Sequence, residues 1–378
     1  MMNSAFKTAL LLLVAALAAV PVVAETESDE EAREKQRKRN ELKNKQESQA
    51  LISAQFSYGF SDVADKLVII SCKSEQGKTF GSGFVARMDG KTYIFTNQHV
   101  IMGADKISFK TASGTQLKPR SVELSLTRDI ARLELETDHA FDIGNEVEMD
   151  IPVAVFGNSE GAGVGTELFG VVNGLGAELV ETSAEFVSGN SGSPILNLSQ
   201  EVLGIASYVR VSRNHAMKEG TKFENQTRRF CYRLSGVEWK SVRWTHYNKQ
   251  YGKLYRQSEM LYNGIFEIIK NWSESPLAKV SIEDNPERSL HSWAKSHNEV
   301  ISRFDRSSAH KRQLMTEYAE SLKKLSGVCR GRARQISMFS EQRELTGFLR
   351  EEFEKQSGSL DYAAQWIDQC SAMIYSQR

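Results

Sequence analysis

The sequence has no excess of charge of either sign: its 378 residues include 48 lysines and arginines and 48 aspartates and glutamates. Proteins whose whole surface holds nucleic acid or an anionic membrane usually carry a bulk excess of basic residues. The balance argues against both classes, and we expect no nucleic-acid partner. Hydrophobic residues make up 40% of the chain, so the composition suits a folded protein of about two domains.

Long hydrophobic runs are also missing. The apolar stretch at residues 9–20 has 12 residues, whereas a membrane-spanning helix needs about 20. It follows Lys7 and precedes small residues at 22–24, which is the arrangement of a secretory signal and its cleavage site. We therefore predict that residues 1–24 are a cleaved signal peptide and that the mature protein is exported, periplasmic or secreted, and without a membrane partner. An uncleaved N-terminal anchor is the alternative.

Cysteine is scarce, and no Cys-x-x-Cys or Cys/His spacing suggests a zinc site. We predict that the protein binds no metal and no cofactor. In an exported chain, four cysteines allow two disulfides. Cys329 and Cys370 lie on apolar helical stripes and form one candidate pair, and Cys72 and Cys231 form the other. Buried free thiols are the alternative for each pair.

Glycine content and hydrophobic periodicity divide the rest of the chain into three parts. Residues 25–56 are rich in charges of both signs, contain no glycine or proline and have almost no apolar stripe, which indicates a solvated helix or a flexible stalk. Residues 57–250 hold most of the glycines among short β-branched runs, a texture typical of an antiparallel sandwich or barrel. Residues 251–378 have the period of amphipathic helices. They predict an α-helical appendage of three or four helices, which is a candidate for self-association.

Three short segments of the β-rich region carry the residue types that acyl transfer needs. His99 follows an apolar strand, Asp129 begins another, and Ser191 lies in a glycine-rich turn at 188–194. A serine hydroxyl becomes a nucleophile when a base takes its proton, and the base needs an acceptor on its second nitrogen. We therefore predict that His99, Asp129 and Ser191 are catalytic. The transition state develops negative charge on oxygen, so we expect the N–H groups of Gly189 and Ser191 to form an oxyanion hole.

These segments resemble the three signature blocks of the trypsin-like, chymotrypsin-fold serine peptidases, and are most similar to the bacterial HtrA-type branch. The blocks are Thr96-Asn-Gln-His-Val100, Asp129-Ile-Ala-Arg-Leu133 and Gly189-Asn-Ser-Gly-Ser-Pro194. The resemblance covers residues 60–235 and implies an all-β double six-stranded barrel with the site in the cleft between the barrels. It also implies protein or peptide substrates and hydrolysis through an acyl-enzyme intermediate.

The sequence matches that branch at a fourth segment and departs from it at other positions. Gly81-Ser-Gly-Phe84 is similar to a strand that precedes the histidine in the family. Gln98 stands where the family usually has a small residue, and Ser193 replaces the more frequent second glycine. No PDZ-like segment follows, and the helical region lies outside the resemblance.

The resemblance also places Glu185 and Phe186 in the pocket for the side chain that precedes the scissile bond. A carboxylate there would favour Lys or Arg through charge-assisted hydrogen bonds. Phe186 at the wall would instead favour small apolar side chains. A solvent-facing Glu185 is the alternative.

The leading interpretation is an exported serine endopeptidase. The alternative is a catalytically silent or weakly active binding or scaffold module that keeps the peptidase fold. The presence of all three triad residue types favours the enzyme. Basic and aromatic residues alternate in residues 227–252, a pattern that can hold single-stranded nucleic acid. We favour instead a last barrel strand and an amphipathic junction packed on the barrel.

Overall fold

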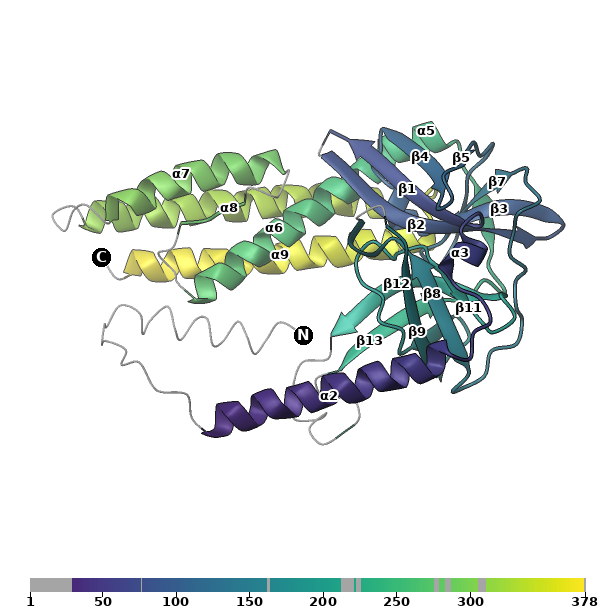
Figure 1. Cartoon of the computed structure of the whole chain (residues 1–378). Helices are drawn as coiled ribbons and strands as arrows, with labels where there is room; N and C mark the ends of the chain where they lie inside the picture. The colour runs from purple at the N-terminus through teal and green to yellow at the C-terminus, as the bar shows by residue number, and fades with distance from the viewer. Residues whose placement is uncertain are drawn as a thin grey trace. The chain divides into compact units, whose positions relative to one another are not determined.

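The computed structural model describes most of the chain after the N-terminus (Figure 1). The predicted signal peptide, residues 1–24, lies outside the described residues. The chain divides into two compact units. The β unit lies within Thr26–Lys249 and includes Thr346–Phe348, and the helical unit lies within Gln250–Leu345 and Leu349–Arg378. The described residues are 29–75, 77–161, 164–211, 221, 226–274, 279–282, 287–304 and 311–376.

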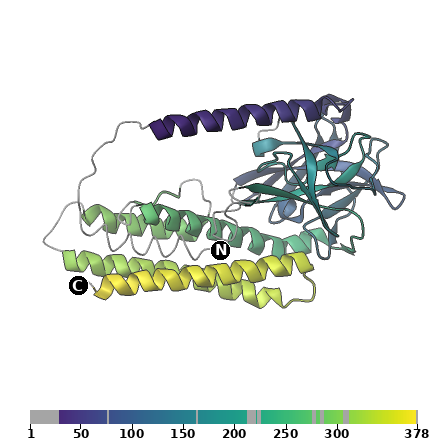
Figure 2. The same cartoon turned by 90° about the horizontal axis from the view of Figure 1, so that it is seen from below.

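The charged N-terminal segment forms one long helix, α2 (Asp29–Ser53), and the short helix α3 (Phe60–Val63) follows it. Side chains described in α2 are mostly exposed, as expected for a helix with no apolar stripe. The helix contacts strand β9 (Thr166–Leu175). Figure 2 shows α2 in purple, with one end against the strands of the same unit.

The first half of the β unit forms an antiparallel sheet of eight strands, in the order β14-β6-β7-β3-β2-β1-β4-β5. The short strand β5 extends one edge. The late strand β14 extends the other by pairing with β6, where Trp239 lies opposite Ser125. The expected double six-stranded barrel therefore does not describe this half. The strands are β1 (Leu67–Ser74), β2 (Gly77–Met88), β3 (Lys91–Thr96), β4 (Lys106–Thr111), β5 (Gln116–Leu117), β6 (Glu123–Ser125), β7 (Ala131–Leu135) and β14 (Trp239–Ser241).

The second half forms a closed antiparallel barrel of six strands, in the order β10-β13-β12-β11-β8-β9. Alternate apolar side chains fill its interior, among them Val153, Val155, Ile195 and Phe186. The all-β character of this part of the chain is confirmed. In addition to β9, the strands are β8 (Pro152–Gly157), β10 (Leu179–Thr182), β11 (Pro194–Leu196), β12 (Val202–Val211) and β13 (Thr227–Tyr232).

Two aromatic side chains of residues 227–252, Trp239 and Tyr247, pack within the β unit, as the junction interpretation predicted. The guanidinium carbon of Arg132 lies 4.4 Å from the ring centroids of both Tyr93 and Trp239. Tyr247 is buried in the short helix α5 (Trp244–Tyr247). These contacts give the aromatic residues a packing role.

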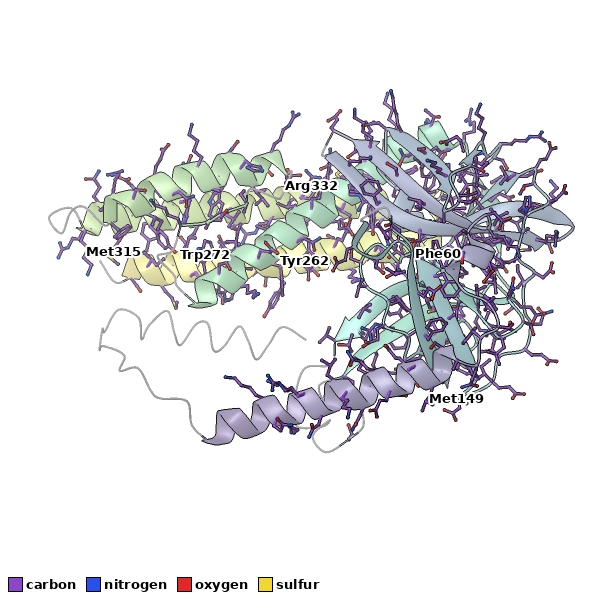
Figure 3. The ribbon with its side chains drawn as sticks, in the orientation of Figure 1. Phe60, Met149, Tyr262, Trp272, Met315 and Arg332 are labelled. Carbon is purple, nitrogen blue, oxygen red and sulfur yellow. The ribbon has the colours of Figure 1, made fainter. Side chains whose placement is uncertain are left out.

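The sequence after residue 250 is helical, as its apolar period predicted. A π-helical turn, η2 (Asn248–Gly252), leads into the first long helix. Trp272 packs edge-on against Trp293, with the ring centroids 5.9 Å apart (Figure 3). No helix among the described residues combines the length and hydrophobicity that crossing a bilayer requires. The long helices are α6 (Lys253–Glu274), α7 (Arg288–Phe304), α8 (Lys311–Ser340) and α9 (Gly347–Ser376).

Neither candidate disulfide is formed, and all four cysteine side chains are buried. Burial raises the pKa of Cys329 to about 12 and that of Cys370 to about 12, because desolvation disfavours the thiolate. In β1, the thiol of Cys72 donates to the backbone oxygen of Val100. The apolar stripes that suggested bridges reflect cysteine packing as a small hydrophobic side chain.

His297 on α7 is a buried titratable group of the helical unit. Its ring stacks on Trp293, with centroids 4.7 Å apart, and its Nδ1 lies 3.1 Å from Ser321 Oγ. Burial lowers the pKa of His297 from 6.5 to about 4, since desolvation disfavours the charged imidazolium. The side chain is therefore neutral in the folded protein at neutral pH.

This burial predicts an acid-sensitive helical unit. Between pH 6.5 and about pH 4 the unfolded chain binds the His297 proton and the folded chain does not, so stability falls as the pH falls through this window. We expect His297 to lower the free energy of unfolding by about 2 kcal/mol at pH 5 relative to pH 7. Urea denaturation followed by tryptophan fluorescence measures the difference. His297→Phe should reduce it and the exposed-site control His291→Phe should not. The same pH difference in all three proteins would contradict this assignment.

Candidate active site

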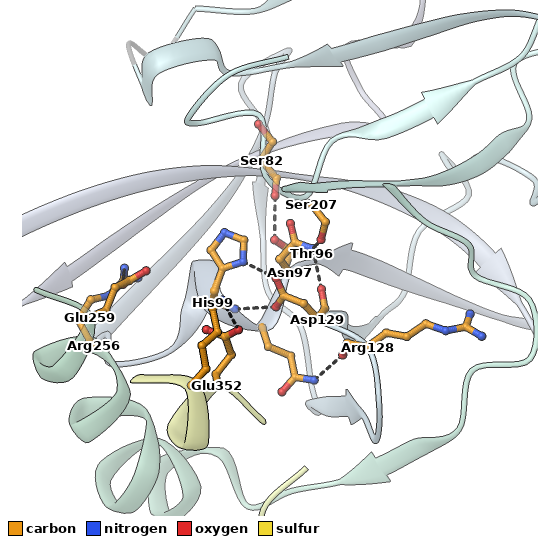
Figure 4. Close-up of polar contacts among 12 residues, drawn as sticks. Ser82, Thr96, Asn97, His99, Arg128, Asp129, Ser207, Arg256, Glu259 and Glu352 are labelled. Carbon is orange, nitrogen blue, oxygen red and sulfur yellow. Dashed lines mark hydrogen bonds and ion pairs between the residues drawn. The ribbon is translucent and has the colours of Figure 1, made fainter. Parts of the chain in front are cut away.

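Asp129 holds His99 at two points. Strand β3 leads into the short helix α4 (Gln98–Ile101), which carries His99, and Asp129 lies in the loop between β6 and β7. Asp129 Oδ2 lies 2.5 Å from His99 Nδ1, and Asp129 Oδ1 accepts the backbone N–H of His99 at 3.0 Å (Figure 4). The Asp129 side chain is 9% exposed and that of His99 is 24% exposed. An ionised carboxylate only accepts, so Nδ1 carries the proton in this pair.

Asn97 ties the histidine segment to the aspartate segment. Its Nδ2 donates to the backbone oxygen of Asp129 at 2.6 Å and to Ser207 Oγ at 2.6 Å (Figure 4). Asn97 is fully buried, so bulk water does not compete for these hydrogen bonds. The backbone around Asp129 is therefore fixed independently of its carboxylate.

Gln98 makes a second tie to the same loop. Its Nε2 donates to the backbone oxygens of Ser125 at 2.9 Å and of Arg128 at 2.8 Å. The side chain is fully buried. Glutamine at residue 98, where the family usually has a small residue, therefore has a structural consequence. A small side chain would not reach these two carbonyl groups.

The turn that carries Ser191 lies between β10 and β11 and depends on two glycines. Gly189 has φ 90° and Gly192 has φ 91°, a region that residues with a Cβ rarely adopt. A Cβ on Gly189 would lie 2.3 Å from the backbone oxygen of Asn158, and one on Gly192 would lie 2.0 Å from that of Ser82. Both positions therefore require glycine.

Ser82 on β2 fixes this turn with two hydrogen bonds and binds Asn158, just after β8, with a third. Its backbone N–H donates to Ser191 O at 2.9 Å, and its Oγ donates to Gly189 O at 2.8 Å. The same Oγ accepts the backbone N–H of Asn158 at 2.9 Å. Thr96 Oγ1, at the end of β3, donates to Ser82 O at 2.8 Å (Figure 4). Ser82 thus links the Ser191 turn to the strand that leads to His99.

Strand β12 makes a second link between the two regions. The N–H of Gly192 donates to Ala206 O, and the N–H of Ala206 donates to Ser193 O, both at 2.9 Å. The next residue, Ser207, accepts from Asn97 as described above. The segments that carry His99, Asp129 and Ser191 are therefore connected by hydrogen bonds through β12.

The backbone N–H and C=O groups of the Ser191 turn differ in their hydrogen bonding. Among the described residues, no backbone hydrogen bond uses the N–H of Gly189 or Ser191. The carbonyl groups of Gly189 and Ser191, in contrast, both bind Ser82.

Glu185 and Phe186 lie in different surroundings from each other. The side chain of Glu185 is 31% exposed, forms an ion pair with Lys45 of α2, and lies 3.9 Å from an Nη of Arg229. Gln49 Nε2 lies 3.4 Å from Glu185 Oε2. Phe186 is 2% exposed and belongs to the core of the closed barrel. Their roles in specificity stay predictions.

Comparison with known proteins assigns this part of the chain. Residues 81–205 match the family model of the trypsin-like peptidase domain. The chain contains a trypsin-like peptidase domain. It is 31% identical over 148 residues to a probable periplasmic serine endoprotease DegP-like of Halomonas elongata, covering 36% of this chain and 31% of that protein. It is 29% identical over 185 residues to the protein of the same name in Rickettsia prowazekii, covering 43% and 36% respectively.

The peptidase domain also aligns with solved structures. One is the serine endoprotease from Yersinia pestis, with a TM-score of 0.36 and 24% identity, covering 47% of this chain and 61% of that chain. The chain spans about a third of the length of the two curated relatives named above.

Sequence reasoning did not find four of the polar residues that position the site. Asn97 and Gln98 adjoin His99, and Ser82 lies within the recognised Gly81-Ser-Gly-Phe84 segment, so their positions carried a signal that was not interpreted. Ser207 lies outside the segments that carry the resemblance and carried no such signal.

The two hydrogen bonds of the Ser82 hydroxyl predict that this group supports both folding and reactivity. In Ser82→Ala the Oγ bonds to Gly189 and Asn158 are lost, and only the backbone bond to Ser191 remains. We expect the free energy of unfolding to fall by about 2 kcal/mol, and the rate at which a fluorophosphonate labels Ser191 to fall about tenfold. Denaturant unfolding and labelling kinetics measure these effects. Ser108→Ala, at an exposed position on β4, is the matched control, and a Ser82→Ala protein that behaves like it would disprove the role.

Proposed function

We propose that the protein is an exported serine endopeptidase that hydrolyses peptide bonds through an acyl-enzyme intermediate, with His99, Asp129 and Ser191 as its triad. The observation that carries the proposal is that the Asp129 carboxylate binds both the backbone N–H and the ring Nδ1 of His99. The glycine-containing turn described above carries Ser191. A carboxylate on Nδ1 fixes the tautomer in which Nε2 accepts a proton. The peptidase-domain match and the names of the relatives support the same chemistry.

Each residue of the triad has one task in this mechanism. Ser191 Oγ attacks the peptide carbonyl carbon while His99 Nε2 takes the hydroxyl proton. His99 then gives that proton to the leaving amine, which breaks the C–N bond and leaves an ester on Ser191. Water attacks the ester, with His99 again accepting and returning the proton, and releases the acid. Both proton transfers need a hydrogen bond between Ser191 Oγ and His99 Nε2 in the substrate complex.

The backbone of the Ser191 turn supplies the oxyanion hole in this proposal. The N–H groups of Gly189 and Ser191 are not used by hydrogen bonds of the described residues, whereas their carbonyl groups are held by Ser82. The N–H of Gly189 shares its peptide plane with Ser188 O, which accepts the Glu160 N–H at 2.7 Å. The N–H of Ser191 shares its plane with Asn190 O, which accepts the Ser193 N–H at 2.9 Å, so both donors are oriented before substrate arrives. Preorganised donors of this kind stabilise the transition state without reorganisation.

Export and self-association are parts of the proposal that rest on the sequence. The apolar segment at residues 9–20 and the printed names of the relatives, which are periplasmic endoproteases, support export. Protein or peptide substrates follow from the peptidase chemistry. Association of copies through the helices stays a prediction.

Covalent labelling tests the nucleophile. We expect a fluorophosphonate to label the full chain once, at Ser191, and Ser191→Ala to abolish both labelling and peptide hydrolysis. Asp129→Asn should keep the fold and lower kcat by about four orders of magnitude, because an amide no longer enforces the required tautomer.

Mass spectrometry of the labelled peptide and a quenched-fluorescence peptide library measure these effects. Ser199→Ala, in the turn between β11 and β12, controls for loss of a serine elsewhere. A folded chain that neither labels nor hydrolyses would favour the catalytically silent binding module instead.

We further propose that Glu185 recognises a basic side chain before the scissile bond, in competition with Lys45. Because Lys45 already pairs with this carboxylate, Lys45→Met should increase the preference for Lys or Arg over Ala, by about tenfold if one charge-assisted hydrogen bond is gained. A peptide library cut by both proteins measures the ratio, and Lys43→Met on the same helix is the control. The absence of a basic preference in both proteins would rule out this role for Glu185.

A further inference from the structure

Three residues that follow α8 in the sequence belong to the same unit as the peptidase domain. Helix α8 ends at Ser340, and Thr346–Phe348 are part of the β unit although more than 90 residues separate them from Lys249. We call Thr346–Phe348 the connector. The connector contacts Gln98 and the loop that leads to Asp129.

The first contact of the connector completes the hydrogen bonding of Gln98. Thr346 Oγ1 donates to Gln98 Oε1 at 3.2 Å, and both residues are fully buried. The Thr346 N–H is itself held by Tyr247 OH at 3.3 Å. With Nε2 already bound to the Ser125 and Arg128 carbonyl groups, the Gln98 amide is paired on both its donor and acceptor sides.

The second contact reaches the Asp129 loop directly. Phe348 N–H donates to the backbone oxygen of Leu126 at 3.2 Å. Gly347 packs so closely that a Cβ would lie 2.8 Å from the same oxygen, a distance that real Cβ contacts do not reach. The connector therefore fits against Leu126 only with glycine at 347.

Both contacts converge on the five residues 125–129. Gln98, buttressed by Thr346, holds the Ser125 and Arg128 carbonyl groups, and Phe348 holds the Leu126 carbonyl group between them. Asp129 ends this loop and holds His99. Losing the Thr346 hydroxyl would leave the buried Gln98 oxygen without that donor, which the loop can relieve only by moving.

We propose that the connector is a positioning element of the active site, and that Thr346 acts through Gln98 to keep the Asp129 carboxylate on His99. This proposal rests on the peptidase function proposed above. It gives the sequence after the peptidase domain a role in completing the site, and it explains the presence of glutamine at residue 98, since a small side chain there would reach neither the loop nor the connector.

Thr346→Val in the full chain tests the proposal, because valine keeps the shape of threonine and removes the hydroxyl. We expect kcat for a peptide substrate to fall threefold to tenfold with KM unchanged, as suits the loss of one buried hydrogen bond. The low-field proton resonance of His99 Nδ1 should broaden or shift upfield. Thr346→Ser, which keeps the donor, should restore both. Thr316→Val on α8 is the matched control and should change neither.

A double substitution tests whether the effect passes through Gln98. Gln98→Met should lower kcat at least as much as Thr346→Val, and adding Thr346→Val to Gln98→Met should lower it no further. A Thr346→Val protein with unchanged kcat and an unchanged His99 resonance, or fully additive losses in the double variant, would overturn the proposal.

The resonance separates this proposal from the proposed function. If the unmodified chain hydrolyses nothing but Thr346→Val still alters the His99 signal, the positioning role holds and the peptidase function fails. If the unmodified chain is active and Thr346→Val changes neither readout, the positioning role is wrong and the peptidase function stands.

Discussion

The pair formed by Asp129 and His99 is the contact on which the rest of the site depends. One carboxylate accepts both the backbone N–H and the ring Nδ1 of the same histidine, so it sets the position, the orientation and the tautomer of the imidazole together. Its low exposure strengthens these bonds and makes their loss costly. The surrounding residues can be understood by how they hold the backbone on either side of this pair.

That backbone is held almost entirely by buried side-chain amides and hydroxyl groups. Asn97 and Gln98 fix the loop before Asp129, Ser82 fixes the turn that carries Ser191, and Ser207 on β12 joins the two regions. Networks of this kind specify one geometry because each buried polar group needs its partner. The glycines of the turn have a separate cause, since a Cβ on Gly189 would meet the backbone oxygen of Asn158 and one on Gly192 would meet that of Ser82.

Much of the fold and the site could be predicted from the sequence, because local patterns encode them. Short β-branched runs and turn residues indicated an all-β region, the apolar period indicated the helices, and the chemistry of acyl transfer singled out His99, Asp129 and Ser191. Contacts between distant segments could not be predicted. Trp239 completes the first sheet opposite Ser125, and Thr346 meets Gln98 across 248 positions. Local periodicity also could not distinguish a buried thiol from a bridged one, because both present the same apolar stripe, as at Cys329.

The most direct measurement of the central claim is rapid chemical quench with an activated peptide ester, followed by mass spectrometry of the peptide that contains Ser191. The proposed mechanism predicts an acyl group on Ser191 that forms in a burst and disappears at the rate of turnover. In the Asp129→Asn protein the same adduct should form far more slowly, because the histidine no longer has its fixed tautomer. Turnover without an adduct, or an adduct on another residue, would contradict a site built around His99, Asp129 and Ser191.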